Sequence, residues 1–427
     1  MLHGSILSWM WIFVLVTACQ VGYDSNIPTK ATITQTVTIT EEKTVVSASP
    51  SISPSVYFEY KRNCLPISPD VEIDDISTGL ILNEVSSTDT KGNVVLLNIS
   101  NGTRTQIFSE NEKINGLRIS PDRNWVAYNV IKTDDPNDSG KLILRNFATN
   151  EIKELPWDDD WDLGGIQKWI NDKQILISLR SSEYPPSRIA LNPFLGQKID
   201  LPSLLPNQEI ESASGEYFPL PEYNSTFDYV IYPASDNGQT GYLLKTATTL
   251  ETVSFIPTQT LMTFSSPAWS NSGNAYTLSI KPFDDQSSNT FELANGSTSQ
   301  QATLITSLGD HIESYYIENI VWSLDDRYIA FVVNDLTDIN NQVSKLMILD
   351  MTNREVLDFC VNVNYANWRG EFADVNSPIW SPNSKELIVE NQYEYGKNDV
   401  ILINLSTMMA SIIEKNKRVL GWVSLNR

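Results

Sequence analysis

Histidine, cysteine and basic residues are scarce in this sequence. Its 427 residues include two histidines and three cysteines, and 30 Lys and Arg residues stand against 52 Asp and Glu residues. Apart from His3 near the amino terminus there is only His311, so histidine-based metal sites and Ser-His-Asp triads are nearly excluded. The net charge of −22 repels phosphate groups, which argues against binding to nucleic acid and to anionic lipid heads.

The chain also lacks two patterns that would indicate other folds. No Gly-x-Ser-x-Gly sequence occurs, so the nucleophile elbow of α/β-hydrolases is missing. Almost no stretch shows apolar residues at helical spacing, which favours an all-β chain. Hydrophobic residues still make up 41% of the sequence and aromatic residues 10%, which is enough for a folded core.

The first residues have the pattern of a secretory leader. The apolar run from Ile6 to Val16 is too short to span a bilayer comfortably, and small residues follow it. The ending "LVTAC" resembles the lipobox of bacterial lipoproteins, which implies cleavage before Cys19 and a diacylglycerol on its thiol. The leader has no Lys or Arg, so an ordinary signal peptide or an uncleaved anchor stays an alternative. We expect a membrane lipoprotein that faces the extracytoplasmic side.

A segment rich in Ser, Thr and Pro follows, including "TKATITQTVTITEEKTVVSASPSISPS". It has no core-forming periodicity, so we interpret residues 19–66 as a flexible tether between the leader, residues 1–18, and a folded domain, residues 67–427. Cys64 and Cys360 are the two cysteines left after processing. Outside the cytoplasm they could form a disulfide that holds the chain at the domain entrance, or remain two buried thiols.

The rest of the chain is organised by an internal repeat. Each copy has an apolar strand that often ends in Trp-Ser, then a short polar turn, then a strongly apolar strand, as in "IVWSLDDRYIAFVV" and "PIWSPNSKELIVEN". Further short strands follow, which makes about four strands per repeat with turns between them. The repeats are marked by Ile119, Trp169, Glu222, Trp269, Trp322, Trp380 and Trp422.

The Trp-Ser-Pro-Asp type of turn resembles the TolB-type, WD-like propeller repeat. It occurs here as "ISPDRNWVAY", "WSNSGNAYTL", "WSLDDRYIAF" and "WSPNSKELIV". The resemblance implies an all-β propeller of four-stranded antiparallel blades. The marks predict seven blades, with six or eight as alternatives. Three strands precede the first mark and one lone strand follows the last full blade, so we expect both termini to share the closing blade.

The order of strands also predicts where the acidic residues gather. We name the strands of a blade a to d from the axis outwards. The a–b and c–d turns then lie on one face, the turn face, and the longer b–c and d–a connections lie on the other, the loop face. By this assignment the loop-face connections hold 25 acidic and nine basic residues, a net charge of −16. That face should concentrate cations.

The stretch "PWDDDWD" is the predicted crossing from the second blade to the third, on the loop face. Aromatic rings beside carboxylates suit carbohydrates or cationic ligands, through stacking and cation–π contacts. The alternative is a solvated loop whose aromatic residues wedge between blades. The predicted ligand-binding residues are Trp157, Asp158, Asp159, Asp160, Trp161, Asp162 and Trp368.

A nearby segment is spaced like the first half of a calcium loop. In "DDPNDSG", Asp135, Asn137 and Ser139 have that spacing, but the carboxylate expected at the twelfth position is absent. An ordinary hairpin turn is therefore the alternative. The two segments flank one blade and could share a Ca²⁺ ion through Asp158 and Asp160. We expect no other cofactor.

These features predict a monomeric binding or scaffold propeller, anchored in the membrane through its amino-terminal lipid. Its partner would be a protein, a glycan or a cationic ligand recognised through the acidic loop face. The alternative is a carbohydrate-active hydrolase or lyase that uses paired carboxylates on the same face. A purely structural propeller without a ligand is the third possibility.

Overall fold

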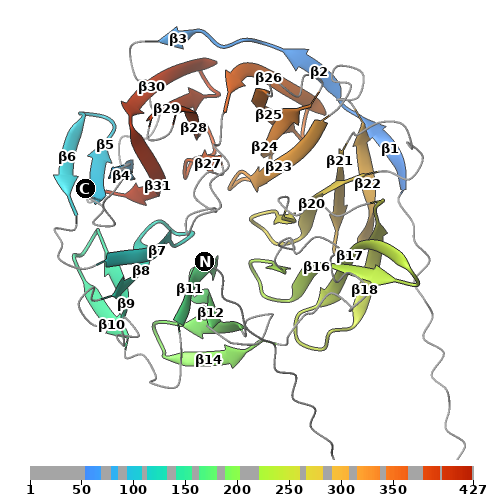
Figure 1. Ribbon diagram of the computed structural model, residues 1–427, viewed down its shortest axis with the longest axis horizontal. Coiled ribbons are helices and arrows are strands. Elements are labelled where there is room, and N and C mark those ends of the chain that lie inside the picture. Colours follow the sequence, from blue (N-terminus) through green and yellow to red (C-terminus); the bar gives the residue numbers. More distant parts are fainter. Residues whose placement is uncertain are drawn as a thin grey trace, which may run out of the picture. The chain divides into compact units, whose positions relative to one another are not determined.

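The computed structural model describes residues 53–68, 78–84, 94–107, 113–131, 141–155, 163–179, 188–201, 221–259, 266–281, 291–306, 315–336, 343–363, 378–394 and 397–425. All of them belong to one compact unit, Ala48–Arg427, and the other unit, Met1–Ser47, lies outside the described residues. The described strands form seven sheets around a central axis (Figure 1). The seven-bladed propeller predicted from the repeats is confirmed. Within these residues, no helix has the length and apolar character needed to cross a bilayer.

Each blade is a meander of four antiparallel strands, which follow one another from the axis outwards. Blade 1 contains β31 (Lys417–Ser424), β4 (Thr78–Glu84), β5 (Val94–Asn98) and β6 (Thr103–Gln106). Blade 2 contains β7 (Lys113–Ile119), β8 (Trp125–Ile131), β9 (Lys141–Asn146) and β10 (Ile152–Leu155). Blade 3 contains β11 (Leu163–Asn171), β12 (Gln174–Leu179), β13 (Arg188–Asn192) and β14 (Gln197–Asp200).

The remaining four blades follow the same order along the chain. Blade 4 contains β15 (Glu222–Tyr223), β16 (Tyr229–Asp236), β17 (Gln239–Thr246) and β18 (Thr252–Pro257). Blade 5 contains β19 (Ala268–Trp269), β20 (Ala275–Ile280), β21 (Glu292–Ser297) and β22 (Gln300–Thr306). Blade 6 contains β23 (Tyr315–Trp322), β24 (Tyr328–Asp335), β25 (Val343–Asp350) and β26 (Glu355–Asn362). Blade 7 contains β27 (Ile379–Trp380), β28 (Glu386–Glu394), β29 (Lys397–Asn404) and β30 (Met409–Lys415).

The core of the propeller lies between blades. The described apolar side chains form seven buried clusters, and each cluster joins two neighbouring blades. Strand β24 shows why the middle strands are apolar on both faces: Phe331 packs with blade 5, whereas Val332 packs with blade 7. A sheet that is covered on both sides needs an almost continuous hydrophobic run, and "YIAFVV" is one.

Repeated tryptophans connect blades 3, 5 and 7 to the blade that precedes each of them. The indole N–H of Trp169 donates to the carbonyl of Arg118, and that of Trp269 donates to the carbonyl of Glu222, at 3.1 and 2.9 Å. Trp380 does the same with Val321, at 3.2 Å. Each of these bonds crosses from an a strand to the a strand of the preceding blade, so the repeated tryptophans have a structural role.

One repeat mark lies one residue away from its predicted position. The turn bond from the N–H of Asn224 to the carbonyl of Tyr229 is equivalent to the bond from Ser270 to Ala275. Buried Tyr223 therefore occupies the place that Trp269 has in the next blade, and Glu222 does not. A buried tyrosine in place of the tryptophan hides the mark in the sequence.

The carboxyl-terminal strand completes the first blade, as predicted. Strand β31 is the a strand of blade 1 and pairs antiparallel with β4, with Trp422 opposite Leu80. The indole of Trp422 donates to the carbonyl of Ile379 in blade 7, at 3.3 Å. Residues from the two ends of the propeller therefore share one sheet and close the ring.

The folded domain begins earlier in the chain than predicted, because part of the segment predicted to be a flexible tether forms strands. Strands β1 (Ser53–Tyr57), β2 (Glu59–Arg62) and β3 (Ile67–Ser68) add a fifth, parallel strand to blades 5, 6 and 7. We call this segment, Ser53–Ser68, the strap, and it runs around the outer rim (Figure 1, blue). The rest of the predicted tether, residues 19–52, lies outside the described residues.

Both side chains and a covalent bond hold the strap in place. Phe58 is buried in the core between blades 5 and 6, and Val56 and Tyr60 pack against that core. A disulfide joins Cys64 of the strap to Cys360 of β26, with 4.8 Å between the Cα atoms. The alternation of apolar residues at positions 56, 58 and 60 is a strand pattern, but the Ser- and Pro-rich sequence before it hides the pattern.

Candidate functional site

The predicted ligand-binding and calcium residues lie outside the described residues. The same holds for the predicted lipidation residue, Cys19. These predictions therefore stay predictions. They concern Trp157, Asp158, Asp159, Asp160, Trp161, Asp162 and Trp368 for ligands, and Asp135, Asn137 and Ser139, with Asp158 and Asp160, for the metal.

The strands on either side of these segments are described. Strand β8 ends at Ile131 and β9 begins at Lys141, so the segment 132–140 joins the b and c strands of blade 2. Strand β10 ends at Leu155 and β11 begins at Leu163, so the segment 156–162 joins blade 2 to blade 3. In an antiparallel meander both connections start and finish at strand ends on the loop face. The assignment of these two segments to neighbouring connections agrees with the strand order.

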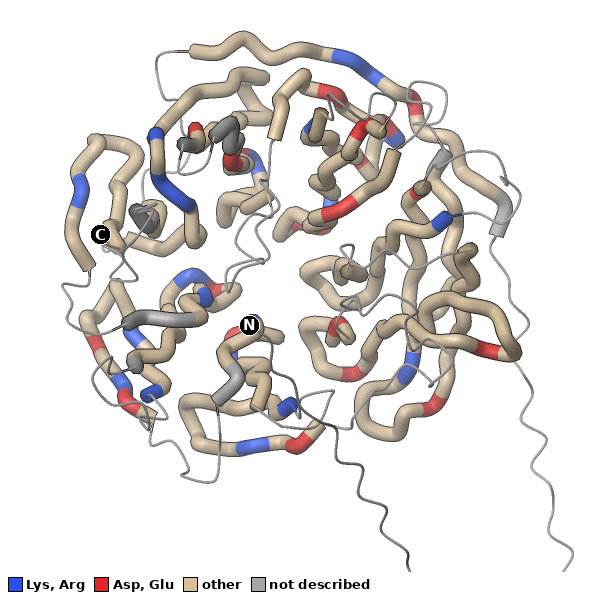
Figure 2. The backbone as a smooth tube through the Cα atoms, viewed as in Figure 1, with Lys and Arg blue, Asp and Glu red and all other residues tan. Residues whose placement is uncertain are grey.

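The charges of the chain are divided very unequally between strands and connections. The described residues contain 24 acidic and 23 basic residues, a net charge of −1. Figure 2 shows that these opposite charges are interspersed around the ring. From residue 85 onwards, the undescribed segments that join b to c strands or d to a strands contain 21 acidic and four basic residues. The sheet framework is therefore almost neutral, and the connections of the loop face carry most of the net charge of −22.

The turn face consists of short turns with a common hydrogen-bond pattern. The hydroxyl oxygen of Ser323 accepts from the N–H of Tyr328 at 2.9 Å, and Ser381 accepts from Glu386 in the same way. Asn224 replaces serine in blade 4, where its Oδ1 accepts from the N–H of Tyr229. Three residues after each of these polar residues the backbone has a positive φ, at Phe227, Asp326 and Ser384. Glycine is usual at such positions, so these turns keep their shape through side-chain hydrogen bonds.

Neighbouring turns also bind one another. The carboxylate of Asp326 in blade 6 accepts from the N–H groups of Asn271 and Ser272 in blade 5, at 2.6 and 3.0 Å. In blades 4 and 5, the hydroxyl of Ser225 donates to the carbonyl of Asn271 at 2.9 Å. These polar groups hold adjacent blades together, so they are structural rather than free for a ligand.

The inner strands carry few carboxylates that could act in catalysis. Glu222 of β15 forms an ion pair with Lys168 of β11, between blades 3 and 4. Burial raises the pKa of Glu318 on β23. No group of three or more His, Cys, Asp or Glu residues with metal-site geometry occurs in the part of the chain that the structure describes.

Glu390 is a buried carboxyl group at the seam where the ring closes. It lies on β28, and its Oε1 accepts from the N–H of Val419 on β31 at 2.6 Å, while its Oε2 accepts from Asn398 at 3.3 Å. Burial raises the pKa of Glu390 to about 7, against the opposing effects of these donors and of Arg418. The only sequence signal for this group is the second Glu of "ELIVEN", which directly follows three apolar residues of the strand, and such a signal does not distinguish a buried carboxyl group from an exposed one.

A polar groove of about 350 Å³ lies at the seam between blades 1 and 2. Its lining includes the amides of Asn98, Asn101 and Asn150 and contains no acidic residue. The guanidinium of Arg145 lies 5.5 Å from the ring centroid of Phe147, which also lines the groove. Amide groups beside an aromatic ring suit an uncharged ligand rich in hydroxyl groups.

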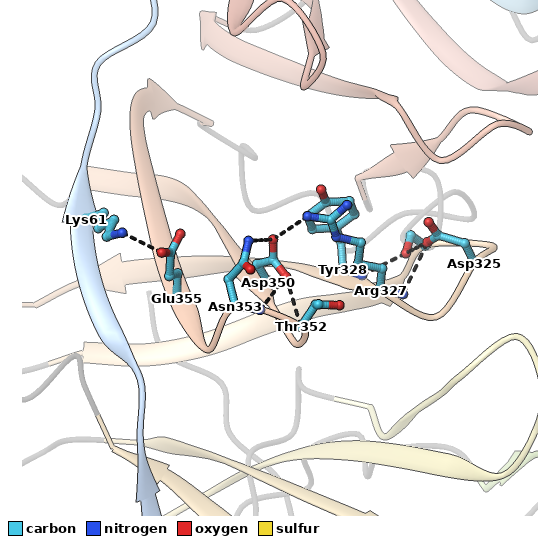
Figure 3. A network of polar contacts seen from close by, with 9 residues as sticks. Lys61, Asp325, Arg327, Tyr328, Asp350, Thr352, Asn353 and Glu355 are labelled. Carbon is cyan, nitrogen blue, oxygen red and sulfur yellow. Dashed lines mark hydrogen bonds and ion pairs between the residues drawn. The ribbon is translucent and has the colours of Figure 1, made fainter.

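Two groups of polar contacts lie on blade 6: one joins the strap to β26, and the other joins the a–b turn to the c–d turn (Figure 3). Lys61 of the strap pairs with Glu355 at the start of β26. The buried carboxylate of Asp350 accepts from Arg327 at 3.0 Å and from the side chain of Asn353 at 2.9 Å. The pKa of Asp350 is lowered because these donors outweigh the desolvation that burial causes. The Lys61 pair holds the strap on β26, and the Asp350 group holds the two turns of the blade together.

The fold and this geometry define a β-propeller. No family model matches the sequence, and no curated protein matches it. Similar solved structures include TolB from Acinetobacter baumannii, with 11% identity over 81% of this chain and 66% of that chain and a TM-score of 0.40. A putative 6-phosphogluconolactonase from Bacteroides fragilis NCTC 9343 has 14% identity over 84% of this chain and 100% of that chain, with a TM-score of 0.47.

A third similar structure is the periplasmic gluconolactonase of Pseudomonas aeruginosa. Its identity is 11% over 82% of this chain and 97% of that chain, with a TM-score of 0.45. A putative TolB from Agrobacterium tumefaciens is also among the similar solved structures, with 11% identity and a TM-score of 0.36. Similarity at this level carries no assignment of activity, because one propeller fold serves many unrelated functions.

Proposed function

We propose that this protein is an extracytoplasmic binding propeller that takes up a cationic partner through the acidic connections of its loop face. The observation that carries the proposal is the division of charge. A framework with a net charge of −1 supports loop-face connections with 21 acidic and four basic residues. Carboxylates gathered between strands add nothing to the core, and their mutual repulsion is relieved by a bound cation or a basic protein segment.

The shape of the framework supports the same proposal. On the turn face, polar groups of the short turns form hydrogen bonds between blades, for example from the N–H groups of Asn271 and Ser272 to Asp326. Long connections on a rigid scaffold are the usual place for recognition. The predicted site from Trp157 to Asp162 is one of these connections, and Trp368 belongs to another.

The first test reverses the charge of this site. The triple variant Asp158→Lys, Asp159→Lys, Asp160→Lys is expected to bind a lysine-rich peptide about tenfold more weakly at low ionic strength, because like charges then repel. The affinity would be measured by isothermal titration calorimetry with heptalysine. Adding salt should weaken binding to the unmodified protein and reduce the difference between the two proteins.

The matched control reverses three exposed acidic residues of the framework, Glu151, Glu154 and Asp200. It changes the net charge equally and is expected to leave the affinity almost unchanged. Equal losses in both variants would show that only the total charge matters. A parallel titration with Ca²⁺, followed by thermal unfolding, tests the predicted metal residues, since a bound ion raises the melting temperature.

The location of the protein is a further part of the proposal. A disulfide such as Cys64–Cys360 is typical of oxidising compartments, which supports an extracytoplasmic domain. The lipobox-like sequence before Cys19 supports a lipid anchor. Replacing Cys19 with Ala is expected to move the protein from the membrane pellet to the soluble fraction, because no acyl chain can be attached. A variant that stays in the pellet after an alkaline wash would contradict the lipid anchor.

The carbohydrate-active alternative stays a prediction. Among the described residues, Glu222 is paired with Lys168, so it is a poor candidate for a catalytic carboxylate. Turnover of a polysaccharide panel that is lost on Asp→Asn changes in the loop-face connections would favour this alternative.

A further inference from the structure

We propose that Cys64 and Cys360 form a thiol–disulfide exchange site that reversibly latches the strap, Ser53–Ser68, to the rim of the propeller. The reductant would be a small dithiol or a dithiol protein. The disulfide lies at the outer rim of the propeller, away from the central axis, and the exchange does not involve the acidic connections of the loop face. Four observations carry it: the exposure of the sulfur atoms, a guanidinium group beside one of them, the backbone at Cys360, and the contacts that the disulfide holds together.

The disulfide lies at the surface of the rim. Cys64 and its neighbours Arg62 and Asn63 are exposed, and Cys360 is half-buried. Attack by a thiolate requires access to a sulfur atom in line with the S–S bond. A buried disulfide is therefore protected from thiol exchange, whereas an exposed one is not. An attacking thiolate can therefore reach Cys64 first.

The guanidinium group of Arg62 lies beside the sulfur of Cys360. The Nε–H of Arg62 donates to Sγ of Cys360 at 3.5 Å. A guanidinium group in this place stabilises a thiolate on Cys360, which makes Cys360 the better leaving group when Cys64 is attacked.

The nearest acidic group is Asp358. It lies 4.0 Å from Arg62, and it accepts from the hydroxyl of Tyr60 at 2.6 Å and from the N–H of Cys360 at 2.8 Å. These donors hold the Asp358 carboxylate, and Nε of Arg62 lies closer to Sγ of Cys360, at 3.5 Å, than to this carboxylate.

The backbone presents Cys360 to the strap in an unusual way. Cys360 has a φ of 59°, in the left-handed region that non-glycine residues rarely adopt. It lies in β26 where the register with β25 is interrupted, between the pairs Met347–Asp358 and Lys345–Asn362. An irregularity of this kind turns a side chain away from the regular alternation of a strand. Here it directs Cys360 to the outer edge, where its sulfur is bonded to Cys64 of the strap.

The exchange proceeds in two balanced steps. The thiolate of the dithiol attacks Sγ of Cys64, the Cys64–Cys360 bond breaks, and the electron pair leaves on Cys360 as a thiolate beside Arg62. The second thiol of the dithiol then attacks its own sulfur in the mixed disulfide and releases Cys64. The protein gains two electrons and two protons as two thiols, and the dithiol is oxidised to a disulfide. Oxidation by a disulfide reverses both steps.

The disulfide holds the carboxyl-terminal half of the strap against blade 6. Around it, the N–H of Asn63 donates to the carbonyl of Asp358 at 2.8 Å, and the N–H of Leu65 donates to that of Phe359 at 3.2 Å. Strands β2 and β3 add few further pairs, four with β26 and two with β30. Without the covalent bond these short pairings are expected to open far more often than the blades themselves.

The experiment treats the full-length oxidised protein with dithiothreitol under native conditions. Free thiols are counted by alkylation and mass spectrometry, and amide hydrogen exchange is followed in the same samples. Cys64 and Cys360 are expected to be reduced without denaturant, and exchange should rise at least about tenfold in the strap and in β26 and β30 while β24 and β28 stay protected. Reoxidation with oxidised glutathione should restore the protection.

Two variants separate the proposal from a purely structural disulfide. Arg62→Gln is expected to slow the native-state reduction about three- to tenfold at unchanged melting temperature, because the leaving thiolate loses its cation. Lys61→Gln removes a neighbouring charge that pairs with Glu355, and it should leave the rate almost unchanged. The double variant Cys64→Ser, Cys360→Ser should fold and show the exchange pattern of the reduced protein. Reduction only after global unfolding, or a reduced strap as protected as the oxidised one, would overturn the proposal.

Discussion

A chain that ends at Lys415 is expected not to form the closed propeller. This truncation removes β31, the a strand of blade 1, and leaves Leu80 and Leu82 of β4 without their cover. It deletes Val419, Trp422 and Val423, which are almost completely buried. Burial of three such side chains contributes about 5 kcal/mol or more, which is comparable to the whole free energy of unfolding of many domains. The expected product is aggregated, or it lacks a cooperative unfolding transition.

The measurement is thermal and urea unfolding, followed by circular dichroism and by size-exclusion chromatography. The matched control removes only residues 426–427, which lie outside the described strands, and it should unfold like the full-length protein. Adding a synthetic peptide of residues 416–425 should restore part of the lost stability, because the strand pairs with β4 in the intact protein. A monomeric truncated chain with an unchanged transition would show that ring closure is not needed for stability.

The second large effect is expected at Glu390, whose ionisation should weaken the folded state. Its pKa is about 7 in the folded protein because of burial, whereas the ordinary value is 4.5. Below the ordinary pKa the group is neutral in both states and costs nothing. As the pH rises from there through about 7, the unfolded chain ionises first, and the folded protein loses about 3 kcal/mol relative to acidic pH.

Replacing Glu390 with Gln should therefore stabilise the protein above pH 7. The amide keeps an oxygen for the N–H of Val419, while its NH₂ group replaces the oxygen that accepts from Asn398 at 3.3 Å; the loss of that long bond does not depend on pH, so the pH-dependent part of the difference is unaffected. The gain is expected to be about 3 kcal/mol at pH 8 and to become small near pH 5. Urea unfolding of both proteins at several pH values measures the difference between their free energies of unfolding. Groups other than Glu390 titrate alike in both proteins, so their contributions cancel in this difference.

Two further outcomes make this prediction specific. Glu251→Gln, which changes an exposed carboxyl group, should leave the pH dependence of the unfolding free energy as it is in the unmodified protein. A Glu390→Gln variant whose stability runs parallel to that of the unmodified protein from pH 5 to 8 would mean that Glu390 ionises at an ordinary pH in the folded state.

The structure confirms the parts of the fold that local patterns encode. Each blade repeats an apolar strand, a polar turn and a second apolar strand, because every blade must cover two neighbours with the same set of elements. That repetition is visible without knowing which blades are in contact. The lone strand at "RVLGWVSL" predicted the closing blade for the same reason, since an unpaired apolar strand must find a sheet.

The strap shows where this reasoning fails. Its strands have two to five residues, and their partners lie far away along the chain, as the separation of 296 residues between Cys64 and Cys360 illustrates. Short segments with Ser and Pro before them have no periodicity strong enough to predict a strand. The sequence left the pairing of the two cysteines open, because nothing local places Cys360 at the outer edge of its blade.

The sequence alone determined the fold class, the shared closing blade and the acidic character of the connections, and it favoured seven blades over six or eight. Periodicity, turn residues and composition are properties of neighbouring residues, so they can be counted without coordinates. Only the tertiary structure decided that the strap belongs to the propeller, that Glu390 is buried at the closing seam, and that Arg62 stands beside the sulfur of Cys360. Each of these depends on contacts between segments that are far apart in the chain, and burial and charge pairing exist only once those segments have met.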